Sequence, residues 1–351
     1  MDFALTQQQQ EILDAVRRYG REKLAPRYQA REREGRIEPG LLEEVGSLGF
    51  IAPEMPEEFG RLGLDAVTAG LIAEETAYHD FNVSYVQLMG SLNATILVRN
   101  APELAREWVP KICAGQVLLG LGLTEPGGGS DAANLKLRAR REGDEYILSG
   151  EKASASFAAH MHQIILFART GTPEQRAHGV SAFLVDMDQP GITRAPYDDV
   201  GTKVVGRGSI FFDGARVPAS HRLGDEGRGF VQVMQGFDYS RGLIGLQCMG
   251  AARASLDETW QYVTEREAFG RPIAKYQGVT EPLALYQTQL EACRLLCYKT
   301  LWLRDQGLAH TSEAAMVKWW APKLAFEIIH QCLITHGHYG YSTDLPHQQR
   351  L

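Results

Sequence analysis

The chain has 351 residues, a length that predicts two or three packed units rather than one hydrophobic core. With 44% hydrophobic and 23% charged residues and no low-complexity tract, its composition is that of a globular protein. The formal net charge of −7, with basic residues scattered among acidic ones, argues against a nucleic-acid-binding surface.

Residues 1–116 are predicted to form a helical domain. Thr6 and Gln9 make a capping box in front of apolar residues at helical spacing. A second helix is expected to open at Pro39 and to stop at Gly49, and a longer helical region to run over residues 65–86.

Residues 117–221 have a different pattern. Short runs typical of strands occupy residues 146–148, 164–167, 180–185 and 210–212, with glycine and aspartate between them. A hairpin turn is expected at residues 142–144. Several short strands joined by turns predict a small β-barrel or sandwich.

Residues 222–351 return to a helical period. Residues 251–267, 279–306 and 312–335 are each long enough for a helix of a bundle. The order of helices, strands and helices predicts an α+β multidomain protein with boundaries near residues 116 and 221.

The sequence gives no sign of a membrane span or a metal site. No apolar run is long enough to cross a bilayer, and the first residues, Met1, Asp2 and Phe3, do not begin a signal peptide. The five cysteines form no CxxC pair, and Cys293 and Cys297 are expected to be buried thiols on one helical face. These features predict a cytoplasmic protein without a bound metal.

A glycine-rich segment at residues 123–131 has the sequence Leu-Thr-Glu-Pro-Gly-Gly-Gly-Ser-Asp. A glycine run alone indicates only a turn, and no Gly-Lys-Ser/Thr follows it as in a P-loop. The string nevertheless resembles the Thr-Glu-Pro-x-x-Gly-Ser-Asp element of the acyl-CoA dehydrogenase family. Four further segments, at residues 150–156, 217–230, 266–277 and 337–346, resemble elements of the same family in order and spacing.

The resemblance spans essentially the whole chain and implies a fold of N-terminal helical domain, central β-barrel and C-terminal four-helix bundle. It implies FAD as cofactor, oxidation of the α–β carbon bond of a coenzyme A thioester, electron-transferring flavoprotein as electron acceptor, and a homotetramer. Family members continue beyond the position of Leu351 into another helix, so some cofactor and substrate contacts are expected to be missing here.

This reaction needs a base for the proton next to the thioester carbonyl, donors for the enolate oxygen, and a hydride acceptor that no side chain supplies. By its residues alone, Asp344 before Pro346 is a turn aspartate. The resemblance places the base there, where most members have glutamate, and places its backbone N–H in the oxyanion site with a flavin ribityl hydroxyl. Ser240, before Arg241, occupies the alternative base position and cannot serve, so only Asp238 remains as a substitute.

The resemblance also assigns the binding residues. It implies that the flavin is contacted by Leu123, Thr124 and Ser156. It also implies that the FAD of a neighbouring subunit is contacted by Arg266, Phe269 and Gln277. Substrate contacts fall on Ser130 and Arg241 for the coenzyme A portion and on Gln87, Leu88 and Met89 for the floor of the acyl pocket. By residue type alone, serines and threonines beside glycines cap turns, and an exposed arginine on a helix is a solvated charge.

Two departures from the family bear on the substrate. Asp344 is one methylene shorter than glutamate, and Ser154 stands where much of the family has tryptophan against the flavin. Both resemble members that act on cyclohexane-1-carbonyl-CoA. The alternatives are a short- or medium-chain linear acyl-CoA, a reduced-flavin monooxygenase on the same fold, which Asp344 disfavours, and a flavin-free scaffold. His336 and His338 near the base have no evident third ligand and do not predict a metal.

Overall fold

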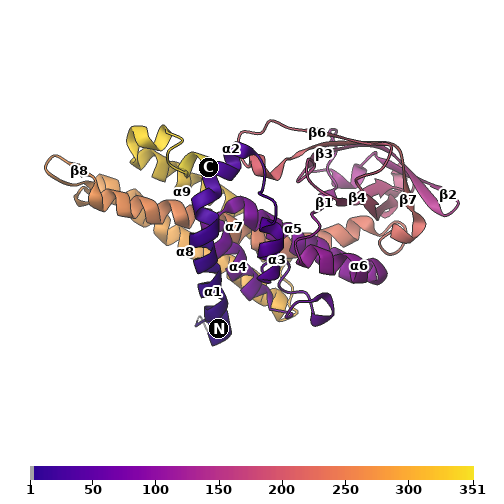
Figure 1. The fold of residues 1–351 in the computed structure, drawn as a ribbon, viewed down its shortest axis with the longest axis horizontal. Coiled ribbons are helices and arrows are strands. Elements are labelled where there is room, and N and C mark those ends of the chain that lie inside the picture. The colour runs from indigo at the N-terminus through magenta and orange to yellow at the C-terminus, as the bar shows by residue number, and fades with distance from the viewer. Residues whose placement is uncertain (1–3) are drawn as a thin grey trace. The chain divides into compact units, whose positions relative to one another are not determined.

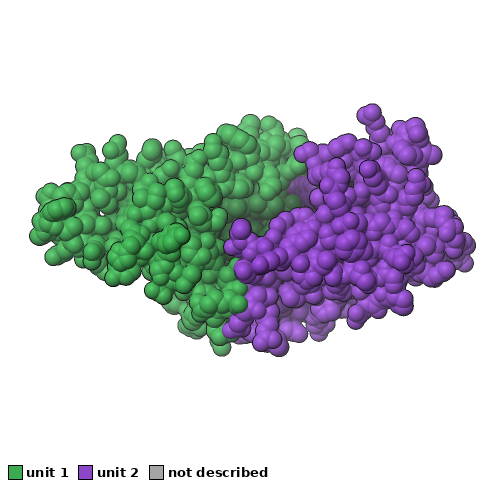
Figure 2. Space-filling model, turned by 90° about the horizontal axis from the view of Figure 1, so that it is seen from above, with its two compact units in different colours: residues 1–33, 65–88, 238–351 green, residues 34–64, 89–237 purple. Residues whose placement is uncertain are grey.

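The computed structural model describes residues 4–351, and Met1, Asp2 and Phe3 lie outside the described residues. The chain divides into two compact units (Figure 2). Unit 1 comprises residues 1–33, 65–88 and 238–351, and unit 2 comprises residues 34–64 and 89–237. Each unit is therefore assembled from stretches of chain that are distant in sequence.

Unit 2 holds a seven-stranded sheet with the order β1-β4-β2-β3-β7-β6, in which β5 also pairs with β4. β1 pairs with the first half of β4, and β2 meets β4 only at Arg169, so two strands share one edge of β4 and the sheet curls. The predicted strands lie in β3, β4, β5 and β7, and the predicted turn joins β2 to β3. The strands are β1 (Leu119–Gly122), β2 (Arg138–Glu142), β3 (Glu145–Ala155), β4 (Gln163–Arg169), β5 (Val180–Asp186), β6 (Ile192–Pro196) and β7 (Gly208–Pro218).

Two short helices also belong to unit 2, α3 (Leu41–Ser47) and α6 (Pro102–Cys113). The helix expected from Pro39 begins later, at Leu41, because Gly40 has a left-handed backbone with φ of 81°. The second half of α5 (Phe81–Asn100) is tied to the sheet by Asn93, whose amide Nδ2 donates to the Leu119 carbonyl at 2.6 Å.

Unit 1 is helical (Figure 1). Buried side chains from α4, α7, α8 and α9 form one hydrophobic core cluster. The predicted capping box at Thr6 and Gln9 is present at the start of α1. The helices are α1 (Gln7–Tyr19), α2 (Tyr28–Glu34), α4 (Ala66–His79), α7 (Gly229–Glu265), whose first residues belong to unit 2, α8 (Gln277–Asp305), α9 (Thr311–Thr335) and α10 (His347–Arg350).

The helical region expected over residues 65–86 is interrupted. α4 ends at His79, and Asp80 is extended, with φ of −156° and ψ of 107°. Its carboxylate accepts the backbone N–H groups of Asn82 and Val83 at 2.9 and 3.1 Å, and it pairs with buried Arg31 at 2.6 Å. Asp80 thus caps a new helix, α5, and the prediction of one continuous helix is wrong.

The predicted order of helices, strands and helices is confirmed. In the described part of the chain after residue 222, the long helices are α7, α8 and α9. Between residues 4 and 351, the structure contains no helix whose length and apolar character would let it span a bilayer.

Candidate active site

Asp344 lies in the loop between a 3₁₀ helix (Gly337–Tyr341) and α10, and its side chain is exposed. Its backbone N–H donates to the Ser342 hydroxyl at 3.1 Å. One residue earlier, the Thr343 carbonyl accepts a hydrogen bond from the Gln29 side-chain amide at 2.8 Å. The loop backbone is therefore held by hydrogen bonds while the carboxylate stays open, as a base for an incoming substrate requires.

Asp238, the substitute base considered from the sequence, is already engaged. One oxygen accepts from the Arg241 guanidinium at 2.9 Å, and the other accepts from the Thr311 hydroxyl at 2.6 Å. Ser240 beside it is buried. This pairing satisfies both carboxylate oxygens of Asp238 and favours Asp344 as the base. It also shows that Arg241, expected to contact coenzyme A, is partly neutralised by Asp238.

Two buried histidines flank the base loop. The rings of His336 and His347 lie 4.5 Å apart, and each residue is almost fully buried. Burial, and then the charge of His336, lower the pKa of His347 to about 4. His338 instead lies against Tyr339, with ring centroids 4.1 Å apart. Residues 4–351 contain no group of three His, Cys, Asp or Glu residues that could hold a metal. His347 was missed from the sequence because no motif marks it.

The predicted flavin segment of unit 2 is fixed by a buried lysine. The Lys152 ammonium donates to the Leu123 carbonyl at 3.0 Å and pairs with Glu125 at 2.8 Å. Burial lowers the pKa of Lys152 to about 8, although Glu125 opposes this shift. The Thr124 carbonyl accepts from the Ala153 N–H at 2.9 Å. Both carbonyls are thus turned inward, which fixes the conformation of the loop backbone.

The same segment fits a flavin chemically. Within the described residues, the N–H groups of Leu123 and Thr124 have no hydrogen-bond acceptor. The flavin pyrimidine edge carries carbonyl acceptors that such donors could satisfy. Beyond them, a Cβ atom added at Gly127 or Gly128 would meet nothing within 4 Å, so the backbone there is open to a ligand. Ser130 follows in the same exposed stretch.

A polar cluster occupies the region of Ser154, where much of the family has tryptophan. Ser154 has a left-handed backbone with φ of 58°, and its hydroxyl accepts from the Arg207 guanidinium at 2.5 Å. Arg207 is held by Asp199 through two hydrogen bonds of 2.5 and 2.9 Å. The Ser154 N–H donates to the Tyr197 hydroxyl at 3.3 Å. Ser156, the predicted flavin contact, lies two residues further along. No sequence motif marks Arg207 or Tyr197.

The residues expected to reach a neighbouring FAD surround a hairpin of unit 1. β8 (Glu267–Ala268) and β9 (Arg271–Pro272) form the hairpin before α8 (Figure 1). Phe269 at its tip is 96% exposed and has φ of 52°. Arg266 and Gln277 are also exposed. Phe269 is thus held outward on a left-handed turn, where another molecule could reach it.

The three residues expected at the floor of the acyl pocket, Gln87, Leu88 and Met89, are all buried. Leu88 is 3% exposed and packs in the core cluster of unit 1. Gln87 is equally buried, and its side-chain amide Nε2 donates to the Thr76 hydroxyl at 3.1 Å. Its carbonyl oxygen has no partner among the described residues. A buried unsatisfied acceptor is costly unless a ligand or water pairs with it, and the role of Gln87 in substrate binding stays a prediction.

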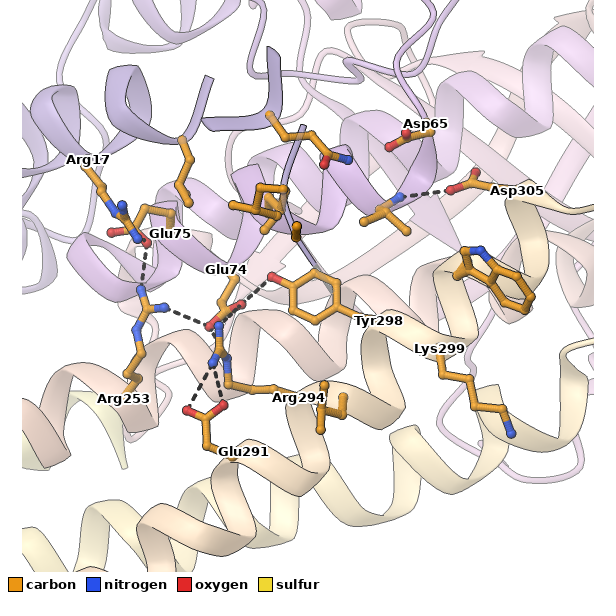
Figure 3. Close-up of a pocket in the computed structure, with 18 of the residues that line it drawn as sticks. Arg17, Asp65, Glu74, Glu75, Arg253, Glu291, Arg294, Tyr298, Lys299 and Asp305 are labelled. Atoms are coloured by element: carbon orange, nitrogen blue, oxygen red, sulfur yellow. Dashed lines mark hydrogen bonds and ion pairs between the residues drawn. The ribbon is translucent and has the colours of Figure 1, made fainter. Parts of the chain in front are cut away.

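A pocket of unit 1 with a volume of about 510 Å³ lies among α1, α4 and α8 (Figure 3). Its charged wall is centred on Glu74, which accepts from Arg253 at 3.0 Å, from Arg294 at 2.7 Å and from the Tyr298 hydroxyl at 2.5 Å. The predicted catalytic and binding residues do not line this pocket. Because its buried charges already neutralise one another, we do not assign the reaction to it.

Comparison with known proteins shows the family of the chain. The family models for the N-terminal, middle and C-terminal domains of acyl-CoA dehydrogenase match residues 6–116, 120–215 and 227–351. The chain is 31% identical to the cyclohexane-1-carbonyl-CoA dehydrogenase of Geobacter metallireducens over 352 residues, covering 98% of this chain and 91% of that protein.

Solved structures of similar fold cover the whole chain. The butyryl-CoA dehydrogenase of Megasphaera elsdenii is similar with a TM-score of 0.95 and 31% identity, over 100% of this chain and 93% of that chain. A structure described as the electron transferring flavoprotein of Acidaminococcus fermentans is similar with a TM-score of 0.96 and 31% identity, with the same coverage.

Proposed function

Since this chain belongs to the acyl-CoA dehydrogenase family of flavin-dependent oxidoreductases, we propose that it oxidises its acyl-CoA with Asp344 as the base. The observation that carries this proposal is the contrast between two carboxylates. Asp344 is exposed on an anchored loop, whereas both carboxylate oxygens of Asp238 accept hydrogen bonds, from Arg241 and from Thr311. Asp344 takes the α-proton of the thioester, and the product is an α,β-unsaturated acyl-CoA.

FAD, when bound, supplies the acceptor for the β-hydride, which no side chain offers. The N–H groups of Leu123 and Thr124 would hold its pyrimidine edge, and Ser156 would be a further flavin contact. From a neighbouring subunit, Arg266, Phe269 and Gln277 would contact the rest of the cofactor, and the guanidinium of Arg266 suits a diphosphate. Ser130 and Arg241 contact the coenzyme A portion, and Gln87 and Leu88 border the acyl group.

The substrate is a thioester with a ring at its α-carbon, of the cyclohexane-1-carbonyl-CoA type. A ring at that carbon is bulky, and the shorter Asp344 leaves more room beside it than glutamate would. Ser154, bonded to Arg207 and Tyr197, puts a polar cluster where much of the family has a tryptophan ring. The relative from Geobacter metallireducens supports a ring substrate, while the structure from Megasphaera elsdenii supports the alternative, a linear acyl-CoA.

Titration of the purified flavoprotein under anaerobic conditions tests the function. Cyclohexanecarbonyl-CoA should bleach the visible flavin absorption faster than butyryl-CoA or octanoyl-CoA. Faster bleaching by the linear thioesters would overturn the ring substrate but keep the reaction. No bleaching by any acyl-CoA, with reactivity of the reduced flavin toward oxygen instead, would favour the monooxygenase alternative.

Partners follow from the same proposal. Electrons leave through an electron-transferring flavoprotein, and reduction of that protein by acyl-CoA in a coupled assay tests this. A homo-oligomer, expected to be a tetramer, is supported by large exposed hydrophobic side chains on α8 and α9. The most exposed of them are Leu285, Leu295, Met316, Trp319, Phe326 and Ile334. A monomeric protein would rarely leave so many on adjacent packed helices.

A further inference from the structure

One face of α7 in unit 1 anchors both ends of the loop that carries Asp344. Ser255, Glu258 and Tyr262 are spaced by three and four residues, which places them on the same face of the helix. Each contacts a residue that flanks the base loop, either Arg350 or His336. The motif that predicted Asp344 contains none of these residues.

The C-terminal end of the loop is held by an ion pair. The two terminal nitrogens of Arg350 donate to the two carboxylate oxygens of Glu258 at 2.7 and 2.8 Å. One of them also reaches the Ser255 hydroxyl at 3.2 Å. The Arg350 side chain is only 6% exposed, whereas that of Glu258 is 42% exposed. A two-pronged, largely buried arginine contact fixes orientation as well as distance.

The N-terminal end is held by stacked rings. Tyr262 stacks on His336 with centroids 4.2 Å apart and an interplanar angle of 24°. His336 in turn contacts His347 across the loop, and its Nδ1 lies 2.9 Å from the Cys332 carbonyl of α9. The ring pair therefore joins the residue at the end of α9 to the first residue of α10.

We infer that Glu258 and Arg350, together with the His336–His347 ring pair, are positioning residues that set where Asp344 meets the substrate. The inference rests on the proposed role of Asp344. The carboxylate is exposed, so its location is determined by where its loop is fixed rather than by contacts of its own. An aspartate also has one methylene less than glutamate with which to compensate for a shift of the backbone.

Glu258→Gln in the flavin-loaded protein tests the inference. Loss of the carboxylate charge should weaken the paired hydrogen bonds between Arg350 and Glu258 and displace the loop. Because catalysis depends on the position of the base, kcat should fall by about 10-fold. KM for the acyl-CoA should stay within about twofold, because coenzyme A contacts lie elsewhere. The deuterium isotope effect with α-deuterated substrate should rise, since proton removal becomes slower. A purely structural contact would not change that isotope effect.

Three further proteins make the test specific. Arg350→Lys keeps the charge but loses the two parallel hydrogen bonds to Glu258, and it should also raise the isotope effect. The exchanged pair Glu258→Arg with Arg350→Glu should recover part of kcat. Glu265→Gln on the same helix, whose carboxylate accepts from Gln261 one turn earlier, should behave like the parent.

Flavin content and Tm are measured for every variant, and kcat is expressed per bound flavin. An unchanged kcat per flavin and an unchanged isotope effect in Glu258→Gln would overturn the inference. Asp344→Asn is measured in parallel. If Asp344→Asn keeps the parent rate, the proposed base is wrong. If it is inactive while Glu258→Gln is unimpaired, only the positioning inference is wrong.

Discussion

The backbone N–H of Asp344 donates to the hydroxyl of Ser342, two residues earlier, at 3.1 Å. This is the donor expected to hold the thioester oxygen as negative charge develops on it. In the proposed mechanism, the Ser342 hydroxyl therefore occupies the position of the substrate oxygen. A substrate would displace the hydroxyl before the N–H stabilises the enolate.

Ser342→Ala removes this internal competitor. Because a net hydrogen bond of this kind is worth about 1 kcal/mol, kcat/KM for the acyl-CoA should rise by up to about fivefold. Steady-state kinetics with the flavin-loaded protein measures the change, and Ser342→Thr, which keeps a hydroxyl, is the control. A lower kcat/KM for Ser342→Ala together with an unaffected Ser342→Thr would show that the hydroxyl assists the reaction instead.

Asp344→Glu restores the side-chain length found in most of the family. The extra methylene should crowd a ring at the α-carbon but not a linear chain. We therefore expect kcat/KM for cyclohexanecarbonyl-CoA to fall by about 10-fold or more, while that for butyryl-CoA is kept within about threefold. Competition of the two thioesters for one enzyme sample measures the ratio directly. An equal fall for both substrates would mean that base length does not select the ring.

Burial of His347 should make stability depend on pH. Its pKa is lowered from 6.5 to about 4, so the unfolded chain binds more protons between these values. The free energy of unfolding should therefore increase as pH rises from about 4 to 6.5, and this histidine should contribute about 3 kcal/mol to the change. Denaturation at several pH values measures it. His347→Phe should flatten the dependence in this window. Equal slopes for the parent and His347→Phe would contradict the prediction.

Sequence patterns predicted those parts of the molecule that depend on local chemistry. The capping box at Thr6, the strands around residues 164 and 180, and the long C-terminal helices all follow from spacing along the chain. The break at Asp80 was missed because the apolar pattern continues through it. Only the pairing with Arg31, 49 residues away, and the capping of α5 reveal why the helix stops.

The candidate site shows the same limit. The resemblance assigned roles to Asp344, Leu123 and Thr124, because each lies in a motif, and these roles stay predictions. It could not locate Arg350 or Arg207, since each acts through a partner that is brought close only by folding. Glu258 is 92 residues from Arg350, and Ser154 is 53 residues from Arg207. Nothing in the spacing of such pairs distinguishes them from ordinary surface charges.

The exposed apolar face of α9 should be an interface between copies of the chain. Trp319 is 70% exposed and Phe326 is 52% exposed. Trp319→Glu combined with Phe326→Glu should place charges against apolar partner surface and shift the protein toward smaller species in sedimentation velocity. If the hairpin at Phe269 serves a neighbouring FAD, the same variant should also lose flavin. Unchanged sedimentation of the double variant would exclude this face as the interface.

The network around Glu74 should be a major source of stability for unit 1. The Glu74 side chain is 2% exposed and joins α4 to Arg253 of α7 and to Arg294 and Tyr298 of α8. Glu74→Gln leaves two largely buried guanidinium groups with less compensating charge. Breaking a buried pair in this way costs about 3 to 5 kcal/mol, so Tm should fall by several degrees.

Two matched variants separate the buried charge from ordinary packing. Tyr298→Phe removes only the hydroxyl that donates to Glu74, and a hydrogen bond to a charged group is worth about 1.5 to 3 kcal/mol. Glu291→Gln removes the other carboxylate that pairs with Arg294. Because the Glu291 side chain is 50% exposed, this change should lower the free energy of unfolding by less than about 1 kcal/mol. The expected order of destabilisation is therefore Glu74→Gln, then Tyr298→Phe, then Glu291→Gln. A Tm for Glu74→Gln no lower than that for Glu291→Gln would show that burial of this carboxylate does not stabilise the helices it connects.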